Sequence, residues 1–169
     1  TTDSMDLTVH DLPIVDAGSD TSFCEDAGVQ ALIGNPLGGV WSGSGIVDSG
    51  GDFDPSSVGP GTYTLTYTYT DGNSCVNSDT RDVTVNGLPL VDAGSDITEC
   101  NQSIPVTLGG VPTGGVWSDQ WSGNYITSGG VFTPNGLGTF LLTYTYTDSN
   151  GCVNTDDITA TVVLPSEAN

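Results

Sequence analysis

The chain has 169 residues, including 24 Gly and 9 Pro, and no window places apolar residues at helical spacing, which excludes a helical protein. Its 21 acidic residues face a single base, Arg81, so the formal net charge is −20. Nucleic acids and anionic lipid surfaces bind cationic patches, so this charge argues against both as partners. No apolar run reaches the length of a membrane-spanning helix, and we expect no membrane insertion by this segment.

The sequence repeats itself at a spacing of 76 residues. The matching residues are Leu12 with Leu88 and Leu164, Cys24 with Cys100, and Trp41 with Trp117. Only Cys75 and Cys152 are 77 residues apart, because the second copy gains residues in "SDQWSGNYIT" and loses some in "PNGLGT". Such length changes belong in loops. A period of this length exceeds that of solenoid repeats and is typical of a self-sufficient β-sandwich.

The repeat divides the chain into two predicted domains. We expect repeat 1 at residues 11–86 and repeat 2 at residues 87–163, joined by the short connector "NGLP". Residues 1–10 resemble the end of a preceding repeat, and residues 164–169 begin the same linker again. We therefore expect a piece of a longer array, monomeric in itself, whose partners are neighbouring repeats of the same polypeptide.

Within each copy the strands follow one another in the same order. Leu32 and Leu108 end a short strand, "GGVWSG" or "GGVWSD" opens the next around a Trp, and "GDFDP" or "GVFTP" carries a Phe inward. In "TYTLTYTYT" strict alternation predicts a strand with Tyr and Leu buried and Thr exposed. The turn residues "DGNS" or "DSNG" then lead into the last strand of a hairpin. The predicted class is all-β, with two tandem immunoglobulin-like β-sandwich domains of about seven strands each.

Three stretches carry a resemblance to a known family. "VDAGSDTSFC", "GGVWSGSG" and "PGTYTLTYTYTDGNSC" resemble the PKD-like, immunoglobulin-like repeats of Bacteroidota surface proteins, including the SprB-type gliding-motility adhesins. The similarity covers nearly the whole chain but singles out no one member. It implies PKD-like sandwiches, an outer-membrane-attached cell-surface location, and a spacer or adhesive role in a very long polypeptide. The "W-D-F-G-D-G" segment of PKD domains in extracellular enzymes is absent, so functions tied to it are not carried over.

In the exported setting that this resemblance implies, we expect one disulfide in each copy, Cys24 with Cys75 and Cys100 with Cys152. Closing a loop of this size stabilises a domain by about 4 kcal/mol in the chain-entropy model. Four cysteines allow about three connectivities. In a plain immunoglobulin topology the cysteines of one copy lie at opposite ends, so the expected pairs require a rearranged first strand. Zinc is disfavoured, because no pair has C-x-x-C spacing and His10 is remote.

Oxygen-bearing side chains near turns are candidate calcium ligands. The candidates are Asp16, Asp20, Asp92 and Asp96 in the two "DAGSD" segments, and Asp71, Asn73, Asp148 and Asn150 in the hairpin turns. The alternative is that Asp and Asn cap their own backbone, and that "DAGSD" is a bulge whose Gly has a positive φ. Because a charge of −20 opposes compaction, divalent ions at domain junctions would relieve repulsion, so we predict weak calcium sites.

Three classes of function are open to such a chain: an enzyme, a binding module and a structural spacer. Catalysis is disfavoured because the chain offers one His, one Arg and no Lys, so we expect no enzyme. A binding module could use Trp121 and Tyr125, whose rings would stack on a surface polysaccharide, although Trp121 could equally cover the core beside Trp117. The rows of Thr that alternate with the buried residues of each long strand resemble ice-binding surfaces. Each row is small, however, and Leu141 interrupts the row of the second copy. We predict a non-catalytic stalk or spacer of a large secreted or cell-surface adhesin, rigidified by calcium.

Overall fold

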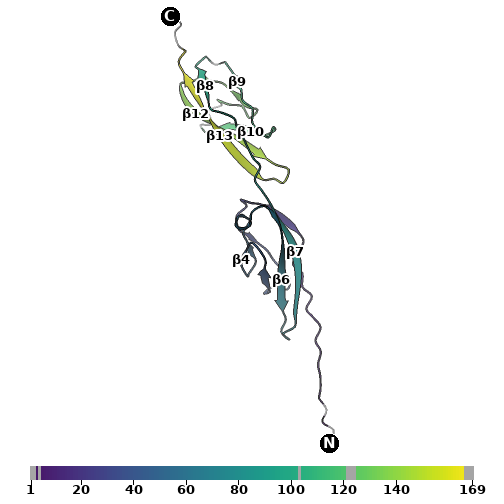
Figure 1. Cartoon of the computed structure of the whole chain (residues 1–169). Coiled ribbons are helices and arrows are strands. Elements are labelled where there is room, and N and C mark those ends of the chain that lie inside the picture. Colours follow the sequence, from purple (N-terminus) through teal and green to yellow (C-terminus); the bar gives the residue numbers. More distant parts are fainter. Residues whose placement is uncertain (1–2, 4, 103, 121–124, 166–169) are drawn as a thin grey trace. The chain divides into compact units, whose positions relative to one another are not determined.

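The computed structural model describes residues 3, 5–102, 104–120 and 125–165. The chain divides into two compact units, Thr1–Gly87 (unit 1) and Leu88–Asn169 (unit 2). Both are immunoglobulin-like β-sandwiches, as the strand pattern predicts (Figure 1). In the part of the chain that the structure describes, no helix has the length and hydropathy needed to cross a membrane.

Unit 1 consists of two sheets. Its described strands are β1 (Thr21–Cys24), β2 (Gln30–Ala31), β3 (Val40–Ser42), β4 (Ile46–Asp48), β5 (Asp52–Phe53), β6 (Gly61–Thr70) and β7 (Val76–Asn86). One sheet has the order β1-β7-β6-β3, and the other has the order β2-β5-β4. A short 3-10 helix, η1 (Pro55–Ser57), follows β5 and is capped by Asp54, whose side chain accepts a hydrogen bond from Ser56 N.

Unit 2 repeats this plan. Its described strands are β8 (Ile97–Cys100), β9 (Val106–Thr107), β10 (Val116–Asp119), β11 (Val131–Phe132), β12 (Gly138–Thr147) and β13 (Val153–Val163). The sheets have the orders β10-β12-β13-β8 and β11-β9. Where unit 1 has β4, the described part of unit 2 has an isolated bridge between Ile126 and Phe132.

The long hairpin of each unit supplies most of the core, and the predicted alternation along it is confirmed. In unit 1, Leu65 and Tyr67 are buried, whereas Thr62 and Thr64 before them are exposed and Thr66 between them is half-buried. The buried side chains pack against Trp41 from β3 and against residues of the facing sheet. The adjacent long arrows of β6 and β7, and of β12 and β13, are visible in Figure 1.

A buried tyrosine fixes the loop before the Trp strand. The Tyr67 hydroxyl donates to Pro36 O at 2.5 Å and accepts from Gly39 N at 2.7 Å. Its ring lies 5.1 Å from the Trp41 ring, centroid to centroid. A Cβ at Gly39 would lie 2.5 Å from the Tyr67 ring, so the second glycine of "GGVW" is needed for this close approach. Tyr144 makes the same two bonds in unit 2, to Pro112 O at 2.6 Å and from Gly115 N at 2.7 Å.

The first strand of each sandwich runs parallel to the last. β1 pairs with β7 from Thr21 opposite Val83 to Cys24 opposite Asn86. β8 pairs with β13 in the same way, with Cys100 opposite Val163. The chain therefore enters and leaves each unit at opposite ends of the long strand.

Replacing Tyr67 by Phe is expected to destabilise unit 1 by about 1–3 kcal/mol, because Pro36 O and Gly39 N lose their partner in a part-buried position. Tyr69→Phe is the matched control, since Tyr69 packs against the same core but lies only partly buried. Hydrogen exchange of β6 and β7 amides measures unit 1 separately from unit 2. Equal effects of the two substitutions would show that the hydroxyl of Tyr67 contributes nothing.

Candidate functional site

The predicted calcium ligands in the hairpin turns serve to close those turns. Asp71 Oδ1 accepts from Asn73 N and from Cys75 N, both at 2.8 Å. Unit 2 has the same turn, in which Asp148 Oδ1 accepts at 2.8 and 2.9 Å from the backbone N of Asn150 and Cys152. The two aspartates therefore act here as backbone caps.

The "DAGSD" aspartates also bind backbone amides. Asp16 Oδ1 accepts from Gly18 N at 2.7 Å, and Asp20 Oδ1 accepts from Asp82 N at 2.9 Å on β7. In unit 2 the corresponding bonds, both 2.8 Å, run from Gly94 N to Asp92 and from Thr159 N to Asp96. Gly18 has a φ of 82°, so the predicted left-handed glycine is present. It lies between Asp16, which forms an isolated bridge with Asn35, and β1, which pairs with β7.

These contacts leave the calcium prediction without an assembled site. Among the described residues, no three His, Cys, Asp or Glu side chains gather closely enough to hold a metal ion. The candidate carboxylates are instead spread over separate turns and strand edges, each with an oxygen directed at a backbone N–H.

The residues that sequence reasoning missed are polar side chains on the last strand. Asn77 Nδ2 donates to Pro13 O at 2.8 Å, and Asp79 Oδ2 accepts from Ala17 N at 2.8 Å. Together with the Asp20 bond they hold residues 13–20 against β7, and we call Asn77, Asp79 and Asp20 the entry clamp of unit 1.

The entry clamp is repeated in unit 2 and had a signal in the sequence. Asn154 Nδ2 donates to Pro89 O at 2.9 Å, Asp156 Oδ2 accepts from Ala93 N at 2.9 Å, and Asp96 completes the set. Each copy has an Asn and an Asp two positions apart directly after the hairpin cysteine, in "CVNSD" and "CVNTD". Side chains two positions apart on a strand share one face, so this pair could have been recognised as a unit.

Backbone hydrogen bonds perturb the acidity of one clamp residue. The amide of Ala17, and to a lesser degree that of Thr80, hold the pKa of Asp79 below its ordinary value of 3.8, against an opposing effect of burial. The ionised carboxylate is therefore the form that the folded unit favours.

The cysteines differ from the predicted pattern. Cys24 and Cys152 are disulfide-bonded, whereas Cys75 and Cys100 are free thiols. The expected pairs, Cys24 with Cys75 and Cys100 with Cys152, are therefore wrong. The physical reason is the parallel first strand: Cys24 lies opposite Asn86, at the far end of β7 from the hairpin turn that contains Cys75. The first strand is not rearranged in the way those pairs require.

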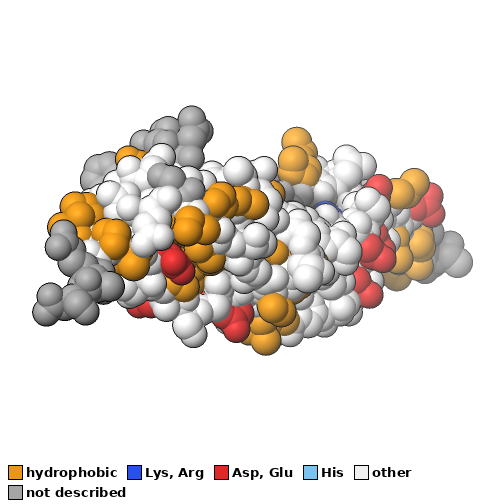
Figure 2. Space-filling view, turned by 90° about the horizontal axis from the view of Figure 1, so that it is seen from above, with side chains coloured by type: hydrophobic (Ala, Val, Ile, Leu, Met, Phe, Trp, Pro, Cys, Tyr) orange, Lys and Arg blue, Asp and Glu red, His pale blue; other side chains and the backbone are white. Residues whose placement is uncertain are grey.

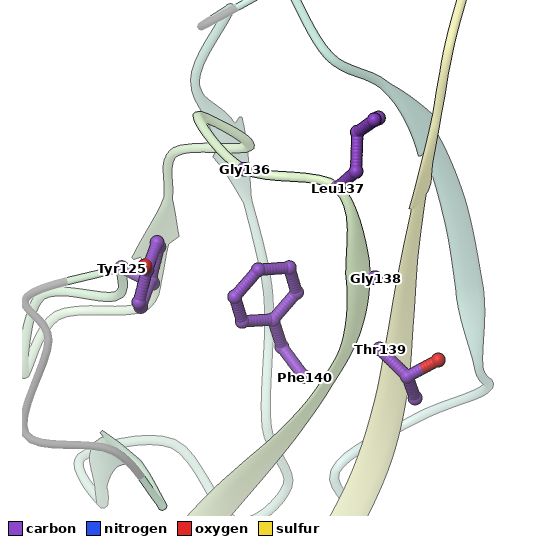
Figure 3. A pocket seen from close by; sticks show the side chains of 6 residues that line it. All are labelled: Tyr125, Gly136, Leu137, Gly138, Thr139 and Phe140. Atoms are coloured by element: carbon purple, nitrogen blue, oxygen red, sulfur yellow. The ribbon is translucent and has the colours of Figure 1, made fainter.

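A cavity of about 400 Å³ opens beside Tyr125 in unit 2. The rings of Tyr125 and Phe140 lie 4.6 Å apart, centroid to centroid. Figure 3 shows both rings at the cavity, with Leu137 and Thr139 along the start of β12. Asp119 Oδ2 accepts from Tyr125 N at 3.2 Å and so fixes the base of the inserted loop. Trp121, the other predicted ligand-binding residue, lies outside the described residues.

In unit 1 a tyrosine and a longer loop occupy the place that corresponds to this cavity. Tyr63, which replaces Phe140, donates through its hydroxyl to Val58 O at 2.8 Å and to Gly59 O at 3.0 Å. These bonds hold the longer loop that contains η1. Unit 2 has a shorter loop and a Phe without a hydroxyl, and the cavity is thus a feature of the second copy.

Comparison with known proteins adds little to this geometry. No family model and no curated protein matches the sequence. Among solved structures, the chain is similar to Sidekick-1 immunoglobulin domains 1-4 (15% identity, 89% of this chain, 48% of that chain, TM-score 0.33). It is also similar to Drosophila N-cadherin EC1-4 (11% identity, 90% of this chain, 50% of that chain, TM-score 0.33). A third similar structure is a Ca2+-stabilized adhesin that helps an Antarctic bacterium reach out and bind ice (14% identity, 92% of this chain, 50% of that chain, TM-score 0.39). The chain spans about half the length of these structures. Likenesses this distant assign no family or function.

Replacing Asp79 by Asn is expected to flatten the loss of stability in acid. Because the folded-state pKa of Asp79 is lowered, its charge stabilises the fold above the ordinary value of 3.8, and this contribution disappears as the pH falls through the lower folded pKa. Urea midpoints measured from about pH 6 down to about pH 2 should therefore drop less steeply in Asp79→Asn than in the wild type. Asp26→Asn, at an exposed position, should keep the wild-type profile. Superimposable profiles for all three proteins would contradict a stabilising role of the Asp79 charge.

Proposed function

We propose that this chain is a non-catalytic, load-bearing spacer segment of a large cell-surface adhesin. The observation that carries the proposal is the parallel pairing of the first and last strands in each unit. Tension between the ends of unit 1 pulls residues 13–24 toward the hairpin end and β7 toward the opposite end. The strands are then loaded in shear, so their hydrogen bonds resist together instead of opening one at a time.

The entry clamp lengthens this shear-resistant contact. Without it, the backbone pairing would cover only the four residues of β1. With the bonds of Asn77, Asp79 and Asp20, the contact starts at Pro13 and runs along most of β7. The first bond to feel tension is the one between Pro13 O and the Asn77 side chain.

Surface chemistry supports an exported, non-enzymatic role. The chain has 21 acidic residues, one Arg and one His, a poor set for acid–base catalysis. The face in Figure 2 shows scattered carboxylates and almost no basic side chains. The resemblance of the repeats to PKD-like segments of Bacteroidota gliding-motility adhesins supports a secreted, outer-membrane-attached protein whose partners are its own neighbouring repeats.

Calcium belongs to this proposal as a stiffening ion that relieves self-repulsion. The net charge of −20 supports it, since divalent cations are drawn to a strongly acidic surface and screen the repulsion among its carboxylates. Sites of the extracellular kind bind with dissociation constants of about 10⁻⁴–10⁻³ M.

Single-molecule pulling in the presence of a reductant tests the load-bearing role. Asn77→Ala removes the hydrogen bond to Pro13 O, worth about 1 kcal/mol, and should raise the rate of forced unfolding of unit 1 about fivefold. Asn73→Ala is the matched control, since the Asn73 side chain is exposed on the hairpin turn.

Equal unfolding forces for Asn77→Ala and Asn73→Ala would contradict the shear model, as would wild-type units that open at forces typical of strand unzipping. Repeating the measurement with millimolar calcium and with excess chelator tests the stiffening separately. Identical force distributions in both solutions would remove calcium from the proposal.

The cavity beside Tyr125 favours a second candidate function, the binding of a surface polysaccharide by unit 2. Its volume of about 400 Å³ suits one or two sugar rings, and the Tyr125 ring offers an aromatic face. On a glycan array, Leu137→Ala should weaken binding severalfold, because Leu137 lines the cavity and is exposed. Leu141→Ala, which changes an exposed leucine outside the cavity, is the control. Absence of any glycan signal from the wild type would exclude this function.

A further inference from the structure

We infer that the peptide bond between Arg81 and Asp82 is a cleavage site for proteases of trypsin-like specificity, closed in folded unit 1 and opened when tension unfolds that unit. Arg81 is the only Lys or Arg in the 169 residues. The chain therefore offers such a protease a single bond, and the place of that bond in the fold decides when the chain is cut. The inference rests on the proposed function in one respect, since the spacer role supplies the tension.

The arginine lies within the strand that carries the load, and not on the outer surface where arginines are usually found. It belongs to β7, where Leu65 of β6 is its register partner. Side chains two positions apart share one face of a strand, so Arg81 points to the same side as Val83 and Val85. Those two valines are buried in the core of unit 1. Arg81 itself is half-buried.

Packing does not explain why an arginine occupies this position. Nη1 of Arg81 donates to Ala17 O over 3.5 Å, and Nε is buried with no hydrogen-bond partner among the described residues. A buried donor without an acceptor lowers stability. Unit 2 has Ile158 at the corresponding position, six residues after the hairpin cysteine, and this side chain belongs to the core. The fold is therefore complete with an aliphatic residue here, and the arginine gives unit 1 a property that unit 2 lacks.

The entry clamp holds the bond that would be cut. The nitrogen of this bond, Asp82 N, donates to Asp20 Oδ1 at 2.9 Å. The Asp82 side chain accepts from Thr64 Oγ1 on β6 at 2.6 Å. Because β7 lies between β1 and β6 in its sheet, neither edge of the strand is free. Proteolysis requires a segment that has opened and left its partners, so folded unit 1 is not a substrate.

Tension removes this protection. Failure of the entry clamp frees one side of the Arg81–Asp82 bond, and separation of β7 from β6 frees the other. The tether then holds the segment as an extended, unpaired chain. Hydrolysis breaks the C–N bond: the hydroxyl of water joins the carbonyl carbon of Arg81, and its proton goes to the nitrogen of Asp82. An array under load would thus release its far part only after unit 1 had opened.

Digestion of the full chain with trypsin tests the closed state. The reference is a peptide with the sequence of residues 76–86, which has the same bond and neighbours without the fold. Cleavage follows the fraction of open molecules, and unfolding constants of small domains favour the folded state by about 10³ or more. We therefore expect the native chain to be cut at least about a thousandfold more slowly than the peptide. Equal rates on a denaturing, reducing gel would overturn the inference.

Two variants separate the effect of the fold from other causes. Arg81→Ile places the residue of unit 2 in unit 1, so the chain should resist trypsin even in urea, with a urea midpoint of unit 1 no lower than that of the wild type. A lower midpoint would show that the arginine is kept for the fold and would contradict the inference. Leu7→Arg adds a site where the side chain is 81% exposed and outside any strand. Native Leu7→Arg should be cut there at once; resistance at that site would assign the protection to the acidic surface and overturn the inference.

The contribution of the entry clamp is tested by Asp20→Ala, which removes the acceptor of Asp82 N. Loss of one such hydrogen bond should raise the cleavage rate of the native chain about fivefold. Asp26→Ala, at an exposed position, is the matched control. Equal rates for the two variants would contradict the closure of this bond by the clamp.

A tether held at constant force with trypsin and reductant in the solution tests the opening. Wild-type tethers should stay intact while unit 1 is folded and break soon after it opens, whereas Arg81→Ile tethers should open and survive. Leu7→Arg tethers should break without load, which verifies the protease in this solution. Wild-type tethers that survive opening, or that break equally often before it, would overturn the inference. The shear model fails separately, since unit 1 that opens at low, unzipping forces would still be cut only after opening.

Discussion

The parallel pairing of the first and last strands is the constraint from which the other features follow. Because β1 runs alongside β7 in the same direction, the chain enters each sandwich at one end and leaves it at the other. An antiparallel pair would return both chain ends to one side and would open stepwise under tension. The parallel arrangement instead suits a module that is repeated in a line and carries load.

That pairing depends on side chains as much as on the backbone. A first strand of four residues offers few hydrogen bonds, and the residues before it follow an irregular path through Gly18. Irregular backbone cannot form a regular ladder, so its polar groups need partners of another kind. The amide of Asn77 and the carboxylates of Asp79 and Asp20 supply them. Asp79 and Asp20 are therefore structural carboxylates.

The sequence was sufficient for the fold class and for the interior of the hairpins, because alternation along "TYTLTYTYT" reports burial directly: Leu65 and Tyr67 are inside. It failed for the cysteines, because spacing along the chain does not say at which end of a strand each residue lies. Which end of β7 lies beside Cys24 depends on the direction of β1, and that direction is a feature of the tertiary structure. The aspartate turns were ambiguous for another reason, since a carboxylate that caps its own backbone and one that binds calcium have the same local sequence.

Each unit has a hydrophobic core of its own. One cluster of buried side chains surrounds Trp41 in unit 1, and another surrounds Trp117 in unit 2. In each cluster a buried tyrosine, Tyr67 or Tyr144, also fixes the loop before the Trp strand through its hydroxyl. The core, this loop and the pairing of the first and last strands therefore lie within one repeat, so each repeat carries its own shear-resistant contact.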